Sequence, residues 1–184
     1  SSPTPSSTTG RSPPGSSVAL AEIEKVVLVG PMAVGKTTVA SLLAGELGWR
    51  FFDSDRQLHA ATGRSARQIA EDLGVGELHQ MELAMLRAAL AGAEPAVIAA
   101  AASVVDDEHA RSELGRVECV WLTADTSALE TRMTADGSSR REVAAGEDLG
   151  RRAALFAEVA DLVVDTTRSS PAECVRQVRA ALGL

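Results

Sequence analysis

The sequence predicts an α/β protein in which an open parallel sheet is covered by helices on both faces. Short apolar runs alternate with stretches of helical periodicity, which is the pattern of strands buried between two helical layers. The chain has 184 residues, a length that suits one domain with a sizeable core. Its residues are 45% hydrophobic but only 3% aromatic, so we expect a core that relies on close contact between helices and sheet.

The predicted elements follow one another in a regular order. The first strand is the β-branched run 26–29, which ends at a glycine. The first helix, 36–47, has its apolar residues at helical spacing, at Val39, Leu42, Leu43 and Leu47. Further apolar runs predict strands at 50–52, 96–102, 117–122 and 162–164. Helical periodicity predicts helices at 66–73, 77–91, 108–114, 127–134, 152–159 and 172–182.

The amino-terminal residues 1–24 are predicted to be a disordered tail or linker that precedes one folded domain, residues 25–184. Residues 1–17 contain only Ser, Pro, Thr and Gly with a single Arg. Such a composition buries too little apolar surface to offset the conformational entropy that folding removes. The first strand-like run therefore sets the start of the domain.

Charge and composition argue against several classes of protein. The net charge is −7 and the chain has no basic cluster, so no nucleic-acid partner is expected. The apolar runs are too short for a transmembrane helix, so no membrane partner is expected either. The two cysteines, Cys119 and Cys174, lie far apart without metal-type spacing, which favours a reducing compartment. We expect a cytoplasmic protein that works as a monomer.

The clearest chemical motif matches G-x-x-x-x-G-K-T and consists of Gly30-Pro31-Met32-Ala33-Val34-Gly35-Lys36-Thr37. It lies between a predicted strand and a predicted helix, as a phosphate-binding loop requires. Backbone N–H groups of the loop and of the helix start, which includes Thr38, can surround phosphate oxygens. Lys36 would add a positive charge near the β- and γ-phosphates, and the Thr37 hydroxyl would ligate Mg²⁺. A chance glycine turn is the alternative, and the flanking strand and helix disfavour it.

A second motif, Phe51-Phe52-Asp53-Ser54-Asp55, ends the next predicted strand. Ligands of open α/β sheets bind outside the carboxyl ends of the strands, so both carboxylates should share a crevice with the phosphate loop. Asp53 is a candidate for holding Mg²⁺ through a water molecule. Asp55 is a candidate for accepting a proton or hydrogen bond from a substrate hydroxyl. The alternative for Asp55 is a helix cap, because it precedes Arg56-Gln57-Leu58-His59.

These two motifs, together with Thr62-Gly63-Arg64-Ser65 and the late segment 155–161, resemble the shikimate kinase family. The resemblance extends from residue 25 to residue 184. It implies a five-stranded parallel sheet of the nucleoside-monophosphate-kinase type, with a P-loop and a lid. It also implies transfer of the γ-phosphoryl group of ATP, with Mg²⁺, to the 3-hydroxyl of shikimate, a step of aromatic amino acid biosynthesis.

The resemblance assigns roles to individual positions. The nucleotide loop is carried by Gly35, Lys36 and Thr37, and Asp53 matches the aspartate on the magnesium side. Asp55 matches the aspartate that contacts the shikimate hydroxyls. Four arginines match further positions of the family. Arg152 matches the arginine that pairs with the substrate carboxylate, and Arg141 matches the lid arginine near the transferred phosphate. Arg132 and Arg168 match the arginines beside adenine.

Three departures from the family pattern affect the substrate site. Leu78-His79 stands where the family has Phe-Arg, and Ala101-Ala102-Ser103 replaces a run of three glycines. The stretch from 146 to 152 is shorter than usual, which predicts a short lid. Histidine lacks the planar two-donor fork with which arginine binds a carboxylate, and the methyl groups of Ala101 and Ala102 would crowd a bound substrate. Each change weakens the match to shikimate itself.

Three interpretations therefore stay open. The chain is a kinase of shikimate or a similar anionic metabolite, a kinase of another hydroxylated metabolite such as a sugar acid, or a non-catalytic nucleotide-binding paralogue. The altered positions at the substrate site favour the second. The replacement Ala101-Ala102-Ser103 supports the third, whereas intact Lys36, Asp53 and Asp55 oppose it. If His79 does not contact the substrate, Arg67 or Arg87 would be the second cation at the carboxylate end.

Overall fold

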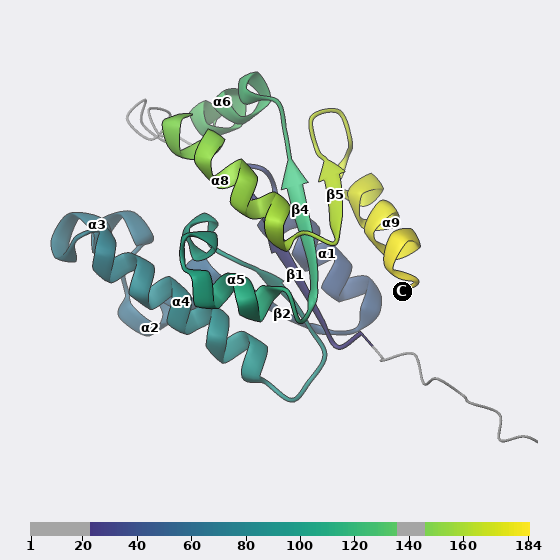
Figure 1. Cartoon of the computed structure of the whole chain (residues 1–184), viewed down its shortest axis with the longest axis horizontal. Coiled ribbons are helices and arrows are strands. Elements are labelled where there is room, and N and C mark those ends of the chain that lie inside the picture. Colours follow the sequence, from purple (N-terminus) through teal and green to yellow (C-terminus); the bar gives the residue numbers. More distant parts are fainter. Residues whose placement is uncertain (1–22, 136–145) are drawn as a thin grey trace, which may run out of the picture.

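Five parallel strands form one sheet with the order β2-β3-β1-β4-β5. The computed structural model describes residues 23–135 and 146–184 (Figure 1). The strands are β1 (Lys25–Val29), β2 (Arg50–Asp53), β3 (Ala96–Ala99), β4 (Glu118–Thr123) and β5 (Leu162–Asp165). The predicted open, five-stranded parallel sheet is confirmed.

The central position of β1 in the sheet explains why its sequence is a continuous apolar run. β1 pairs with β3 on one side and with β4 on the other, and helices cover both of its faces. Val26, Val27, Leu28 and Val29 are accordingly fully buried. The edge strands β2 and β5 are more exposed, and in each of them only one residue is buried, Asp53 in β2 and Val164 in β5.

Helices cover the sheet on both sides, as predicted. They are α1 (Lys36–Leu47), α2 (Ser54–Thr62), α3 (Ala66–Leu73), α4 (Val75–Ala91), α5 (Glu108–Leu114), α6 (Thr126–Ala135), α8 (Gly146–Val159) and α9 (Pro171–Leu182), with a one-turn 3₁₀ helix η1 (Ala102–Asp106). In Figure 1, α5 and α8 lie in front of the strands and α1 lies behind them. No helix within 23–135 or 146–184 is long and apolar enough to cross a membrane.

Two apolar clusters lie on opposite faces of the sheet. On one face, Leu43 of α1 and Val178 of α9 pack against strand residues. On the other, Leu86 of α4, Leu114 of α5 and Phe156 of α8 do so. A third, smaller cluster joins α2, α3 and α4 at the side of the sheet.

Several predicted boundaries differ from the structure. The third strand ends at Ala99 rather than at 102, because the apolar run continues into η1, where Val104 and Val105 are buried in a helical turn. Periodicity does not separate a buried strand from a buried turn in so short a run. α8 begins at Gly146 rather than at 152, since its glycines lower the helical signal of its first turns. The tail prediction lies outside the described residues, except at residues 23 and 24.

Candidate active site

A cavity of about 1190 Å³ opens at the carboxyl ends of β1, β2 and β3. The segment from Met32 to Val39 forms one wall, and Asp53 and Asp55 lie beside it. The far wall comes from α3, α4, η1 and α8. The two sequence motifs therefore meet in one cavity, as their positions at neighbouring strand ends predict.

The loop from Gly30 to Gly35 depends on unusual backbone conformations. Gly30 has a φ of 141°, and a Cβ there would lie 2.4 Å from the carbonyl oxygen of Leu122, so a larger residue does not fit. Ala33 has a φ of 61° and Gly35 a φ of 101°. Gly35 precedes α1 and offers no side-chain cap, so the first N–H groups of α1 are left for a ligand. The loop is shaped to receive an anion.

Lys36 is folded back onto this loop. Its Nζ donates hydrogen bonds to the carbonyl oxygens of Gly30 and Pro31, both at 2.8 Å. Burial lowers the pKa of Lys36 from 10.5 to about 8, although the charges of Asp55, Asp53 and Glu82 partly oppose the shift. A phosphate group that approaches Lys36 would bring the negative charge that favours the protonated amine.

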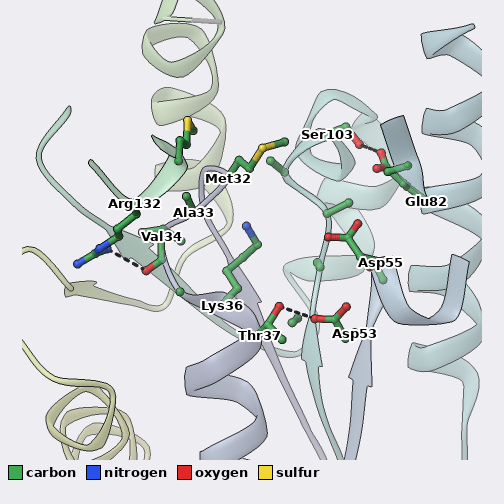
Figure 2. Close-up of a pocket in the computed structure, with 18 of the residues that line it drawn as sticks. Met32, Ala33, Val34, Lys36, Thr37, Asp53, Asp55, Glu82, Ser103 and Arg132 are labelled. Carbon is green, nitrogen blue, oxygen red and sulfur yellow. Dashed lines mark hydrogen bonds between the residues drawn. The ribbon is translucent and has the colours of Figure 1, made fainter. Parts of the chain in front are cut away.

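Thr37 and Asp53 are joined across the cavity floor (Figure 2). The Thr37 hydroxyl donates a hydrogen bond of 2.5 Å to Asp53 Oδ2, while Asp53 Oδ1 accepts from the backbone N–H of Arg56 at 3.0 Å. Asp53 is therefore the N-cap of α2, and the alternative interpretation of Asp55 as the cap is wrong. The local reason is that Asp53 keeps an extended backbone, whereas Asp55 already lies in the first helical turn.

Asp55 faces the cavity between Lys36 and Glu82 (Figure 2). Partial desolvation by the cavity walls raises the pKa of Asp55, the charge of Asp53 raises it further, and Lys36 opposes the shift. A carboxylate with a raised pKa is a better proton acceptor than an ordinary aspartate. Because a backbone cap is already supplied by Asp53, Asp55 is left to interact with a ligand.

The far wall of the cavity contains the predicted acceptor residues. His79 of α4, Arg152 of α8, and Ala101 and Ala102 at the β3–η1 junction all line it. Ala101 has a φ of −62°, which any residue adopts, so the alanines impose no backbone strain. Of the two arginines named as alternatives to His79, Arg67 lines the cavity and Arg87 does not.

Sequence reasoning missed Glu82, which lies on the same wall. Its carboxylate is buried and accepts a hydrogen bond from the Ser103 hydroxyl (Figure 2). Burial raises the pKa of Glu82, while the Ser103 hydrogen bond and the charge of His79 oppose the shift. One signal was present: Glu82 lies between Leu78 and Leu86 at helical spacing, so it falls on the buried face of α4.

The nucleotide end of the cavity brings together Arg132 and the phosphate loop. Arg132 Nη2 donates to the carbonyl oxygen of Thr166 at 2.7 Å, and the Thr166 hydroxyl donates to that of Val34 at 3.1 Å. Arg168 lies outside the cavity, beside a shallow hollow on α9. Arg141 falls outside the described residues.

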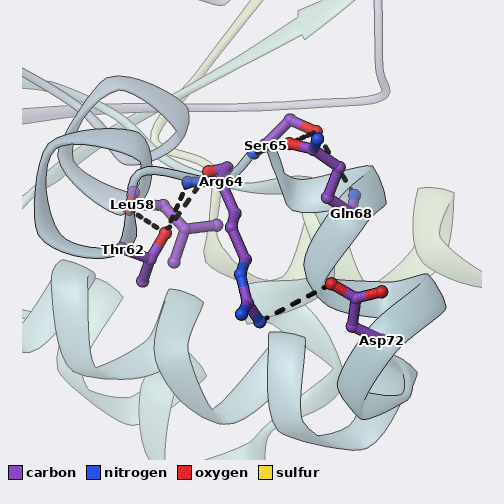
Figure 3. A network of polar contacts seen from close by, with 6 residues as sticks. All are labelled: Leu58, Thr62, Arg64, Ser65, Gln68 and Asp72. Atoms are coloured by element: carbon purple, nitrogen blue, oxygen red, sulfur yellow. Dashed lines mark hydrogen bonds and ion pairs between the residues drawn. The ribbon is translucent and has the colours of Figure 1, made fainter.

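The Thr62-Gly63-Arg64-Ser65 motif has a structural role in the described chain (Figure 3). The Thr62 hydroxyl donates to the carbonyl oxygen of Leu58 at 2.7 Å and accepts from the N–H of Arg64 at 3.1 Å. Ser65 and Gln68 form a capping box that starts α3. The motif therefore ends α2 and begins α3, which places both helices beside the acceptor wall.

A glycine loop between a buried parallel strand and a helix, with a basic side chain folded over it, defines the class of P-loop nucleotide-binding proteins. Comparison with known proteins narrows this class. The family described as Shikimate kinase matches residues 32–183. Shikimate kinase 2 from Salmonella schwarzengrund is 33% identical over 170 residues, which cover 87% of this chain and 92% of that protein. The chain therefore belongs to the shikimate kinase family.

Solved structures agree with this assignment. The shikimate kinase from Acinetobacter baumannii in complex with shikimate superposes with a TM-score of 0.80 at 25% identity, covering 88% of this chain and 94% of that one. A gluconokinase from Sinorhizobium meliloti, at 22% identity, shares the fold with a TM-score of 0.58 over 86% of this chain and 91% of its own. Since this fold occurs with different acceptors, the acceptor has to be argued from the site.

Proposed function

We propose that the chain transfers the γ-phosphoryl group of ATP to a hydroxyl of shikimate or of a similar anionic metabolite. The observation that carries the proposal is the convergence of Lys36, Asp55 and Arg152 on one cavity. They supply, in turn, a cation for phosphate, a hydrogen-bond acceptor for a hydroxyl and a cation for an acidic group. Use of ATP favours a cytoplasmic location.

The phosphate loop would bind and orient the nucleotide. Phosphoryl transfer needs positioning and neutralisation of charge more than covalent chemistry from the protein. Backbone N–H groups from Ala33 to Thr37 would donate to the phosphates, and Lys36 would leave the carbonyl oxygens of Gly30 and Pro31 to contact them. Arg132 would stay fixed to Thr166 at the adenine end.

Thr37 and Asp53 fit a magnesium ion. Both offer oxygen atoms, which Mg²⁺ prefers, and the Thr37 hydroxyl can present a lone pair while its proton remains donated to Asp53. Within the described residues no cluster of three or more His, Cys, Asp or Glu could hold a metal ion, which suits a cation carried mainly by nucleotide phosphates. When bound, Mg²⁺ would neutralise charge on the transferred group.

Asp55 and the far wall would hold the acceptor. Asp55 would accept the proton or hydrogen bond of the attacking hydroxyl, and its raised pKa suits that role. Arg152 would bind an acidic group of the acceptor through a charge-assisted hydrogen bond. His79 offers a single donor at the place where the family has arginine, which predicts weak binding of shikimate.

His79→Arg tests the acceptor end. We expect a shikimate KM well above the micromolar to millimolar range in the wild type, and a decrease of about tenfold in His79→Arg, the value of one charge-assisted pair. Steady-state kinetics at saturating ATP would measure it. His59→Arg, on the exposed surface of α2, is the matched control and should change nothing. A submillimolar wild-type KM that His79→Arg leaves unchanged would instead point to Arg67.

A second acceptor class is supported by the same wall. His79 and the alanines at 101 and 102 differ from the family pattern, which favours another hydroxylated acid, such as a sugar acid. The presence of Lys36, Thr37 and Asp55 in one cavity argues against a paralogue without turnover. A screen of ATP consumption across hydroxylated acids would separate these interpretations.

A further inference from the structure

Asp106, at the end of η1, pairs with Arg152, the arginine on the acceptor wall. The Nη2 of Arg152 lies 2.7 Å from Asp106 Oδ2, and its Nε lies 3.2 Å from both carboxylate oxygens. One edge of the guanidinium is thus held side-on. Arg151 approaches the same carboxylate, with its Nη2 3.1 Å from Oδ1.

The carboxylate of Asp106 lies behind the guanidinium rather than in front of it. Arg152 lines the cavity, whereas Asp106 does not. The carboxylate therefore does not occupy the space that an acceptor would enter. It fixes the direction of a long side chain which, unpaired, would have considerable rotamer freedom.

Asp106 is ionised where it meets the two arginines. Burial alone would raise the pKa of Asp106, but hydrogen bonds and charge from Arg152 and Arg151 outweigh it, so the pKa lies below its ordinary value. The charged carboxylate therefore holds Arg152 through charge-assisted hydrogen bonds, which are stronger than neutral ones.

The turn that carries Asp106 is itself held firmly. Arg111 of α5 donates to the carbonyl oxygen of Val105 at 2.8 Å and pairs with Glu158 of α8. Asp107 pairs with Arg87 of α4 and caps α5. Contacts from three helices therefore give Asp106 a fixed position from which to orient Arg152.

We propose that Asp106 is a positioning residue, which holds Arg152 from behind in the direction that binds the acidic group of the acceptor. The proposal rests on the proposed function. A positioning role through Arg152 affects the binding of acceptor in the ground state and the transition state alike, so KM should change while kcat does not.

The test compares Asp106→Ala with wild type by steady-state kinetics, using shikimate or whichever hydroxylated acid the wild type phosphorylates. We expect the acceptor KM to rise roughly tenfold, with kcat and the KM for ATP within about twofold. Asp106→Glu keeps the charge and should recover most of the loss. Glu46→Ala is the matched control: it removes a carboxylate that pairs with Arg179 at 2.8 Å away from the cavity, and it should leave the acceptor KM unchanged.

A double-substitution cycle then separates positioning from a general structural effect. In an Arg152→Met background, Asp106→Ala should add no further rise in acceptor KM. An unchanged or lower KM in Asp106→Ala alone, or an equal rise in the Arg152→Met background, overturns the proposal while leaving the kinase activity established. A wild type that phosphorylates no hydroxylated acid overturns the proposed function, and the role of Asp106 with it.

Discussion

Lys36→Ala is expected to lower kcat/KM by about 10²–10³ and to remove most of the thermal stabilisation that Mg-ATP gives the wild type. Lys36 is the one lysine or arginine within the loop motif 30–37, so no other side chain of the motif takes over its contact with phosphate. When the concentration of Mg-ATP is about 100 times its Kd, binding should raise the free energy of unfolding of the wild type by about 2.7 kcal/mol. For a chain of this size, that corresponds to a rise of roughly 5–10 °C in Tm. Differential scanning fluorimetry with and without Mg-ATP measures the loss.

The chain offers a matched control for this substitution. Its only other lysine, Lys25, begins β1 and donates to the carbonyl oxygen of Glu94 at 2.7 Å, and it does not line the cavity. Lys25→Ala should keep the full Mg-ATP shift. Equal stabilisation of Lys36→Ala and wild type by Mg-ATP would refute the assignment of the phosphate loop.

The lowered pKa of Lys36 adds a pH signature to the same experiment. The protonated amine binds phosphate, and the free protein loses this proton as the pH rises through about 8. Binding of Mg-ATP must then take up a proton, so its affinity should fall above this pH in wild type. In Lys36→Ala, that component of the pH dependence should be absent.

Asp55→Asn is expected to lower kcat by about 10²–10⁴ without weakening the binding of ATP. An amide keeps the size of the side chain but accepts a proton poorly. The loss of a negative charge beside Lys36 also removes a repulsion toward nucleotide phosphates, so the affinity for ATP should be equal or higher. Single-turnover kinetics together with nucleotide titration would separate the two effects.

The pH profile identifies Asp55 further. Because its pKa is raised, wild-type kcat should fall on the acid side at a higher pH than an ordinary aspartate would give. Asp72→Asn is the control, since Asp72 is exposed and pairs with Arg64 at 3.6 Å outside the cavity. Turnover of Asp55→Asn at the wild-type rate would leave Asp55 without a part in the transfer.

The features predicted correctly from the sequence are those with a local signal. The strands contain short apolar runs, and the phosphate loop has glycines at two positions where the backbone has positive φ, Gly30 and Gly35. The pair of aspartates was found for the same reason, because both lie at the carboxyl end of one strand. The alternative interpretation of Asp55 as a helix cap is wrong because Asp53, two residues earlier, already caps α2.

The features that were missed depend on contacts between distant parts of the chain. Glu82 meets Ser103 across 21 positions, and Arg152 meets Asp106 across 46. Spacing along one helix or strand does not encode such pairs. The predicted end of β3 was wrong because the apolar run continues past Ala99 toward η1. Val104 and Val105 are buried there in a helical turn rather than in a strand.

The most direct test of the proposed function is ³¹P NMR of wild-type protein incubated with Mg-ATP and shikimate. We expect ADP and a new phosphate monoester on the acceptor hydroxyl to form in equal amounts, slowly and with a high KM for the acceptor. Lys36→Ala should form neither at a comparable rate. A wild type that Mg-ATP stabilises, but that yields no phosphate monoester from shikimate or from any other hydroxylated acid, would contradict it.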